Sequence, residues 1–124
     1  MIGEGGIFYS SDAGASWTQV FSYNTDEIVR HPTSPSTLFA SHRSSSTAGL
    51  GPAKSTDGGL TWVDSGSGVS GSYGRSEVAI SPSDPNYLYL YTGANDLFRS
   101  TDGAATWTMA NAAACDGQCW YNLS

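Results

Sequence analysis

The sequence predicts an all-β protein made of repeated four-stranded antiparallel units, and three observations support this fold class. An octapeptide with the pattern Ser-x-Asp-x-x-x-(Ser/Thr)-Trp occurs three times, at residues 10–17, 55–62 and 100–107. A strand, a Pro-x-x-Pro turn and a second strand occur twice, at 26–41 and 76–91. Only 13% of the residues are charged, while glycine, serine, threonine and aromatic residues are abundant. This composition favours short strands and tight turns over long helices.

The three octapeptides, named here the first, second and third in chain order, are spaced by 57 − 12 = 45 and 102 − 57 = 45 residues. A fixed period of this size indicates a repeat architecture. In each octapeptide the aspartate can accept backbone N–H groups, and glycine permits a positive φ angle. The Ser/Thr hydroxyl can satisfy a further backbone group, and the tryptophan can lie across the hairpin. The residues assigned to these structural turns are Ser10, Asp12, Gly14, Trp17, Ser55, Asp57, Gly58, Gly59, Trp62, Ser100, Asp102, Gly103 and Trp107.

The strands follow from the turns. Residues 5–10 lead into the first octapeptide and 17–21 return from it, which gives half a unit. Each Pro-x-x-Pro segment supplies two strands, with the prolines placed where no ladder donor is needed. The chain of 1–124 is therefore divided into strands three and four of one unit (5–21), a complete second unit (26–65), a complete third unit (76–110) and the start of a fourth (120–124).

The octapeptides resemble the Asp-box, or BNR repeat, of sialidases, sortilin-type receptors, xyloglucan-cleaving enzymes and a photosystem assembly factor. These relatives are β-propellers in which the box joins strands three and four of a blade. The resemblance implies a partial β-propeller with two complete four-stranded antiparallel blades, half of a preceding blade and the start of a following one. The segment 95–103, Asn-Asp-Leu-Phe-Arg-Ser-Thr-Asp-Gly, is similar to xyloglucanase-type and sortilin-type repeats. The early (Phe/Tyr)-Arg-Ile-Pro motif of sialidases is absent from the sequence.

Two loops are longer than the repeat requires, because the proline segments align at an offset of 50 rather than 45. The extra residues lie within 41–53 and 65–75, which are rich in glycine and serine. In an up-and-down blade these loops lie at the end opposite the octapeptides, and loop insertions on one face favour a binding face. The candidate ligand-binding residues there are His42, Arg43, Tyr73, Arg75, Trp120 and Tyr121, and Asp26 and Glu27 lie near the end of a strand. The alternative is that these are ordinary solvated loop residues and that Trp120 is part of a strand core.

The resemblance implies a secreted or surface propeller that binds a carbohydrate or another polymer as a scaffold. The alternatives are a fragment of a glycoside hydrolase of the xyloglucanase type and a sortilin-like propeller that binds protein. A glycosidase needs two carboxyl groups, about 5–5.5 Å apart for retention or roughly 6.5–9.5 Å for inversion. Outside the octapeptides the best-placed acids are Asp26, Glu27 and Glu77, and the sequence pairs none of them. It therefore shows no complete catalytic constellation.

The remaining expectations concern partners and chemistry. The net charge is −6 with only five Lys and Arg residues, so no nucleic-acid partner is expected. No apolar run is long enough to cross a membrane, and no signal peptide is visible. Cys115 and Cys119 favour a local disulfide or two free thiols over a metal site, and no cofactor is expected. Because a propeller needs several blades, we expect either further blades of a longer chain or self-association through open sheet edges.

Overall fold

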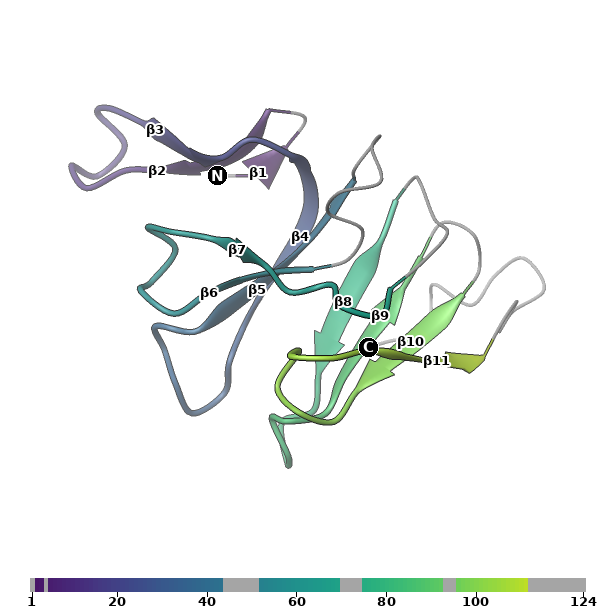
Figure 1. The fold of residues 1–124 in the computed structure, drawn as a ribbon. Helices are drawn as coiled ribbons and strands as arrows, with labels where there is room; N and C mark the ends of the chain where they lie inside the picture. The colour runs from purple at the N-terminus through teal and green to yellow at the C-terminus, as the bar shows by residue number, and fades with distance from the viewer. Residues whose placement is uncertain (1, 4, 44–51, 70–74, 93–95, 112–124) are drawn as a thin grey trace.

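The computed structural model describes residues 2–3, 5–43, 52–69, 75–92 and 96–111. In this part of the chain, eleven strands form three antiparallel sheets and no helix occurs, which confirms the all-β fold class (Figure 1). No helix in these ranges is therefore long and apolar enough to cross a membrane.

The first sheet contains β1 (Ile2–Gly3), β2 (Gly6–Tyr9) and β3 (Thr18–Phe21). The second contains β4 (Asn24–Arg30), β5 (Leu38–Arg43), β6 (Ala53–Ser55) and β7 (Val63–Asp64). The third contains β8 (Glu77–Ile80), β9 (Leu88–Tyr91), β10 (Leu97–Ser100) and β11 (Thr108–Asn111).

The first sheet has one strand more than the sequence predicted. Strand β1 pairs with β2, with Ile2 opposite Ile7 and Gly3 opposite Gly6. Two residues carry no alternation pattern, so this strand has no sequence signal. Gly6 has a φ of 105°, and a Cβ atom there would lie 1.9 Å from the carbonyl oxygen of Phe21. The β2–β3 pair therefore requires glycine at this position.

The second and third sheets have the same strand order and equivalent registers. In the second sheet, Val29, Phe39 and Lys54 lie opposite one another on β4, β5 and β6. In the third, the equivalent row is Ala79, Tyr89 and Arg99. We call the face that carries each of these rows the forward face of its sheet. Because side chains alternate along a strand, the residues between them point to the opposite face.

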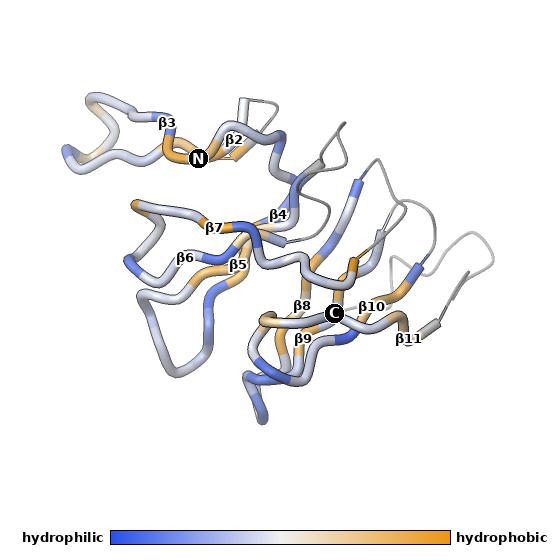
Figure 2. Tube along the Cα trace, in the orientation of Figure 1, coloured by the Kyte–Doolittle hydropathy of each residue, from blue (hydrophilic) through white to orange (hydrophobic). Residues whose placement is uncertain are grey.

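The main hydrophobic core lies in the seam between the second and third sheets. Its buried members are Phe39 from the second sheet and Val78, Leu88, Leu90, Phe98, Ala104 and Trp107 from the third, with Val29, Val69 and Ile80 packed against them. Hydrophobic segments of β5, β8 and β9 stand out in Figure 2. The forward face of the second sheet is therefore buried against the third sheet, as expected for consecutive blades.

The proline turns and the octapeptides lie together at one end of the sheets. The Gly58 N–H donates to the carbonyl oxygen of Ser36 at 2.9 Å, and the Gly103 N–H donates to that of Asn86 at 3.1 Å. Figure 1 shows the β2–β3, β4–β5 and β6–β7 turns at this end.

The second long loop predicted from the sequence, within 65–75, was expected at the opposite end, but its residues 65–69 lie against the third octapeptide, where the Trp107 N–H donates to the carbonyl oxygen of Ser67 at 2.8 Å. Most of the first long loop, within 41–53, lies outside the described residues.

Candidate functional site

Each octapeptide is closed by one repeated set of hydrogen bonds. In the first, the Ser10 hydroxyl donates to Asp12 Oδ1 at 2.8 Å and accepts from the Gly14 N–H at 2.8 Å. Asp12 also accepts from the backbone N–H and the hydroxyl of Ser16, at 2.8 and 2.5 Å. The second and third octapeptides repeat this set, with Thr61 and Thr106 in the place of Ser16. Both carboxylate oxygens are thus used within the turn.

These hydrogen bonds stabilise the charged form of the three aspartates. The pKa of Asp12, Asp57 and Asp102 is lowered to about 2, first by the Ser/Thr hydroxyl and then by the backbone N–H of that same residue. All three carboxylates are exposed and ionised near neutral pH. A group that holds its proton only below about pH 2 is a poor general acid near neutrality. The octapeptide aspartates therefore act as turn acceptors.

The turns require two successive residues with positive φ. Ala13 and Gly14 have φ angles of 59° and 90°, Gly58 and Gly59 have 77° and 97°, and Gly103 and Ala104 have 70° and 72°. Glycine adopts this region without strain, while an alanine does not. Two of the six positions therefore carry a residue that the turn disfavours.

At the opposite end, acidic side chains of β4 bind backbone N–H groups at the start of β8 and of the residue before it. The Ser76 N–H donates to Asp26 Oδ2 at 3.1 Å, and the Val78 N–H donates to Glu27 Oε2 at 3.2 Å. The Ser41 hydroxyl donates to the carbonyl oxygen of Ser76 at 2.9 Å. Ser41 and Ser76 are buried, with 0% and 8% of their surface exposed. Backbone groups at a buried seam need such partners, so these side chains join the two sheets.

The two serines were missed as site residues by the sequence analysis. The available signal was the offset of 50, which places Ser76 at the position equivalent to Asp26. That alignment shows that Asp26 and Ser76 are equivalent in their units, but it does not show that the two residues bind each other. The hydrogen bond between them forms only because the second and third sheets pack side by side.

Glu27 is a partly buried acid in strand β4. Burial raises its pKa, and the negative charge of Glu77 acts in the same direction. The Val78 N–H and the positive charge of Arg75 oppose this rise. Glu77 and Arg75 are therefore near enough to Glu27 for their charges to act on its carboxyl group. A carboxyl group with a raised pKa, near a second carboxyl group, has the electrostatics of a functional site.

His42 lies in strand β5 and only 5% of its surface is exposed, although the sequence analysis placed it in a loop. Its ring lies 5.3 Å from that of Tyr23 in a stacked arrangement and 5.2 Å from that of Phe21 in an edge contact. Neither ring nitrogen has a hydrogen-bond partner in the described structure. Burial lowers its pKa, and Asp64 and Asp26 partly oppose this shift. His42 is therefore neutral near pH 7 and packs the seam between the first and second sheets.

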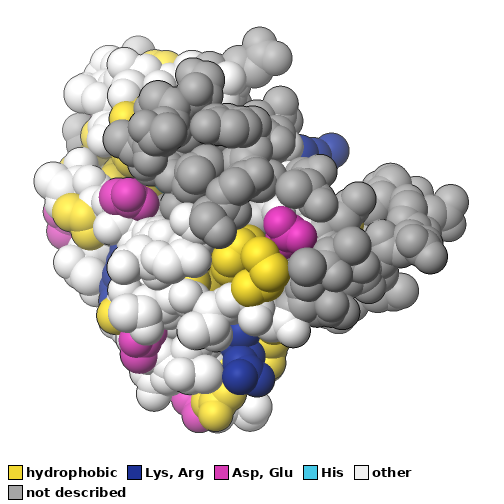
Figure 3. All heavy atoms as spheres, turned by 45° about the vertical axis from the view of Figure 1, so that its right-hand side comes forward, with side chains coloured by type: hydrophobic (Ala, Val, Ile, Leu, Met, Phe, Trp, Pro, Cys, Tyr) yellow, Lys and Arg dark blue, Asp and Glu magenta, His cyan; other side chains and the backbone are white. Residues whose placement is uncertain are grey.

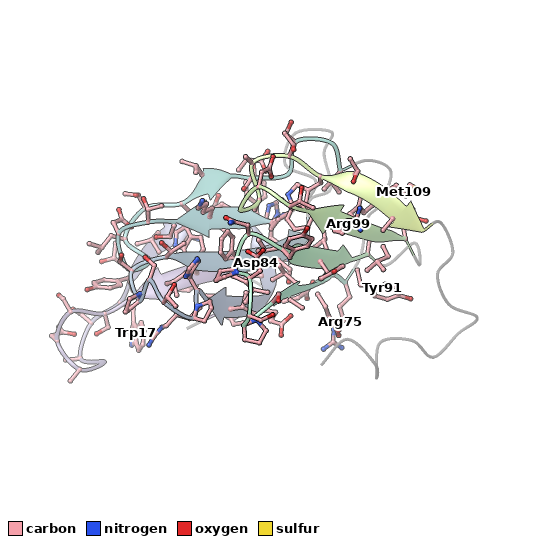
Figure 4. All side chains as sticks on the ribbon, turned by 90° about the horizontal axis from the view of Figure 1, so that it is seen from below. Trp17, Arg75, Asp84, Tyr91, Arg99 and Met109 are labelled. Atoms are coloured by element: carbon pink, nitrogen blue, oxygen red, sulfur yellow. The ribbon has the colours of Figure 1, made fainter. Side chains whose placement is uncertain are left out.

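The other predicted site residues are distributed as follows. Arg75 is exposed just before β8, and Figure 4 shows it near Tyr91. Arg43 lies in β5 opposite Asn24, and only its backbone is described. In the described part of the chain, no three His, Cys, Asp or Glu residues are grouped as metal ligands. Tyr73, Trp120, Tyr121, Cys115 and Cys119 lie outside the described residues.

Comparison with known proteins supports the fold. No protein-family model and no curated protein sequence matches the chain. The structure of an ancestral GH74 enzyme matches with a TM-score of 0.64 at 20% identity, and the match covers 82% of this chain and 15% of the enzyme. The GH74 xyloglucanase from Xanthomonas campestris matches with a TM-score of 0.36 at 14% identity, over 84% of this chain and 21% of that enzyme, and this likeness supports no argument.

The chain thus spans about a sixth of the length of the ancestral enzyme. The three sheets are blades of the β-propeller kind, as in GH74 enzymes. At this level of identity the likeness establishes the fold, and activity has to be argued from the site.

Proposed function

We propose that this chain forms consecutive blades of a β-propeller in a secreted glycoside hydrolase that cleaves a β-glucan such as xyloglucan. The observation that carries the proposal is the match to the ancestral GH74 enzyme over 82% of the chain. On this proposal the three octapeptides are Asp-boxes, which hold the hairpins of the blades. The carbohydrate-binding scaffold, favoured from the sequence alone, becomes the second candidate.

The cluster of Glu27, Glu77 and Arg75 is where this segment would contribute to hydrolysis. A general acid works best when its pKa lies near the working pH, and burial moves the pKa of Glu27 in that direction. Glu77 is half-buried and close enough to act on that pKa. Arg75 is exposed beside them and offers planar N–H donors to sugar hydroxyl groups.

The test measures reducing ends released from xyloglucan, mixed-linkage β-glucan and cellulose, by this chain and by the longest natural polypeptide that contains it. We expect release from at least one polymer, and a loss of more than about tenfold in rate in the Glu27→Gln variant. Glutamine keeps an oxygen that accepts from the Val78 N–H, so the seam should remain closed. Asp57→Asn is the matched control, because it changes an exposed turn carboxylate.

Three results would contradict parts of this proposal. The hydrolase function is wrong if the longest polypeptide releases no reducing ends from any of the three polymers. The Glu27 cluster is wrong as the site if Glu27→Gln and Glu77→Gln both retain full activity. It is equally wrong if Asp57→Asn lowers activity as much as Glu27→Gln does.

The scaffold function is kept as the second candidate because Asp26 accepts a hydrogen bond from the N–H of Ser76 and Glu27 accepts one from that of Val78. Carboxylates that accept backbone hydrogen bonds between two sheets have a structural role, and this role fits a segment that supports a binding surface without catalysing a reaction. Affinity electrophoresis in xyloglucan gels, with Arg75→Ala, Trp120→Ala and Tyr121→Ala variants, tests this function. The scaffold function is favoured if the native chain is retarded in the xyloglucan gel, the substitutions reduce this retardation, and no hydrolysis is detected. It is excluded if the native chain migrates equally fast with and without xyloglucan in the gel.

A further inference from the structure

His42 is a buried imidazole that lacks the hydrogen bonds a buried polar side chain normally has. In the part of the chain that the structure describes, its two ring nitrogens are the only buried side-chain nitrogen or oxygen atoms without a partner. Figure 3 shows acidic side chains at the molecular surface, whereas no histidine atom reaches the described part of that face. Because most buried polar groups in folded proteins are hydrogen-bonded, an exception of this kind calls for a physical explanation.

The imidazole lies among aromatic rings that join the first and second sheets. Tyr23 stacks on it with ring centroids 5.3 Å apart and an interplanar angle of 27°, and Phe21 meets it edge-on at 5.2 Å. Phe21 also lies 5.3 Å from Tyr23 and 6.2 Å from Trp62. We call these four residues the aromatic seam. Phe21 ends β3 and Tyr23 follows it, while His42 and Trp62 belong to the second sheet and its octapeptide, so the packing of these rings holds the two sheets together.

Two carboxylates act on the imidazole, and neither accepts a hydrogen bond from it. They are Asp26 of β4 and Asp64 of β7, whose negative charges favour a protonated ring. Asp26 accepts from the Ser76 N–H and Asp64 accepts from the Gly66 N–H, at 3.1 Å in both cases. Both acids are therefore engaged with backbone groups, and neither neutralises His42 by direct contact.

The other described elements packed around β5 add no charge that acts on the imidazole. The first sheet and the connection after it present the Phe21 ring and the Tyr23 phenol. Lys54 of β6 donates to the third octapeptide, and Glu77 of β8 acts on Glu27. A proton on the imidazole would therefore create a buried cation whose N–H groups have no acceptor, a state that burial disfavours.

We propose that His42 is a proton switch: in mild acid its ring takes up a proton, leaves the aromatic seam for water, and loosens the contact between the first and second sheets. The opened ring binds its proton near pH 6.5, as a histidine in water does, whereas burial in the closed seam lowers the pKa of His42. The opened state therefore binds more protons below about pH 6.5, and the closed seam loses stability as the pH falls through that range.

The hairpins respond differently to acid, which makes the switch local. The octapeptide aspartates, with their pKa lowered to about 2, keep their charge and their turn hydrogen bonds through the range in which His42 takes up its proton. Mild acid therefore loosens the packing between two sheets and leaves the turn within each octapeptide closed. This switch goes beyond the proposed function, because it acts whether or not the propeller hydrolyses a glucan.

Hydrogen–deuterium exchange at about pH 7.5 and about pH 5, on either side of the ordinary histidine pKa, tests the switch in the longest natural polypeptide that contains this chain. Rates are corrected for the pH dependence of chemical exchange. The amides of 18–25 and 38–43 should then exchange about fivefold faster or more in acid, since each pH unit below 6.5 favours the protonated open state by up to about tenfold. The octapeptides at 10–17 and 100–107 should keep their protection.

The sequence contains two histidines, so His31 provides a matched control for His42. His42→Phe keeps a ring in the aromatic seam and cannot take up a proton, so its corrected exchange should be the same at both pH values. His42→Leu has the same purpose and replaces it if the phenylalanine variant does not fold. His31→Asn removes the other imidazole and keeps an acceptor for the N–H groups of Thr33 and Ser34, so the acid response should remain.

Glu27→Gln identifies the other group that takes up a proton in mild acid. Glu27 accepts from the Val78 N–H, so its protonation acts on the seam with β8 and leaves 18–25 protected. The proposal is overturned if 18–25 and 38–43 are equally protected at both pH values in the native protein. It is also overturned if the His42 variants keep the acid response, or if His31→Asn or Glu27→Gln abolishes it.

Discussion

The first and third octapeptides have the same hydrogen bonds and very different surroundings. In both, the aspartate binds a Ser/Thr hydroxyl and the N–H of the same residue, and its pKa is lowered to about 2. Trp17 is 48% exposed, while Trp107 is 3% exposed. The hairpin is therefore formed by residues within the octapeptide, and the burial of its tryptophan depends on the neighbouring sheet.

The segment that leaves the second sheet covers the third octapeptide. Trp107 donates from Nε1 to the carbonyl oxygen of Ser65 at 2.6 Å, and its backbone N–H donates to that of Ser67 at 2.8 Å. The second octapeptide is intermediate, because half-buried Trp62 lies 6.2 Å, ring to ring, from Phe21 of the first sheet. The second and third octapeptides are thus each packed by the unit that precedes them in the chain.

The largest difference is expected when the two tryptophans are truncated. Trp107→Ala should lower the free energy of unfolding by about 3–5 kcal/mol, because it removes a fully buried indole from the core. Trp17→Ala should change it by less than about 1 kcal/mol, since its indole is half exposed. Urea unfolding of each variant gives both values. Equal losses would show that the tryptophan acts within its own hairpin.

A second difference is expected between two glycines, Gly68 in the segment that covers the third octapeptide and Gly58 in the second octapeptide. Gly68 has a φ of 95°, and a Cβ atom there would lie 2.1 Å from the Trp107 carbonyl oxygen. Gly68→Ala should therefore cost about 2–4 kcal/mol from overpacking and backbone strain together. Gly58 has a φ of 77° with no atom within 4 Å of an added Cβ, so Gly58→Ala should cost only about 1 kcal/mol.

The same urea titrations measure this pair. A cost for Gly68→Ala no greater than that for Gly58→Ala would mean that the segment 65–69 moves away from Trp107 at little expense. The third octapeptide would then resemble the first more closely than its burial indicates.

The features that the sequence predicted are those formed by neighbouring residues. The 45-residue period located the hairpins, and the Asp and Gly positions identified their turn chemistry. The Pro-x-x-Pro segments located β4, β5, β8 and β9, because alternation and proline placement are local properties. Strand β1 was not predicted, since Ile2 and Gly3 form a strand only by pairing with β2.

The features that the sequence did not predict are contacts between sheets. Asp26 and Glu27 were named as candidate acids, and the backbone groups that they bind lie 50 and 51 residues away. His42 was expected in a loop, and it lies in β5 between two aromatic rings. Polar residues near a loop are expected to be exposed when only the sequence is known. Their burial depends on how closely the neighbouring sheet packs against them, which the sequence does not show.

A smaller difference is expected from the two alanines with positive φ. Ala13→Gly should raise the free energy of unfolding by about 0.5 kcal/mol, because relief of backbone strain exceeds the entropy that glycine adds to the unfolded chain. Ala104 has the same strain and is 0% exposed in the core. Ala104→Gly should therefore destabilise the chain by about 0.5–1 kcal/mol, since the loss of a buried methyl group outweighs that relief. Paired thermal unfolding curves measure both changes.

No difference between the octapeptides is expected in acid. The pKa of all three aspartates is lowered to about 2 by hydrogen bonds within the turn, whereas an unfolded aspartate has a pKa of about 3.9. Because the folded pKa is the lower one, these groups stabilise the fold fully above about pH 4 and lose that effect as the pH falls through about 2. Carboxyl carbon chemical shifts, followed from pH 5 to pH 1.5, should give overlapping titrations for Asp12, Asp57 and Asp102.

The Ser16→Ala and Thr106→Ala variants sharpen this last prediction. Each removes the hydroxyl that most lowers the pKa of its aspartate, so the titration midpoint of Asp12 or Asp102 should rise toward its ordinary value by the same amount. The other two aspartates in each variant serve as internal controls. A larger rise for Asp102 than for Asp12 would mean that the neighbouring sheet, and not the turn alone, determines the charge of the third octapeptide.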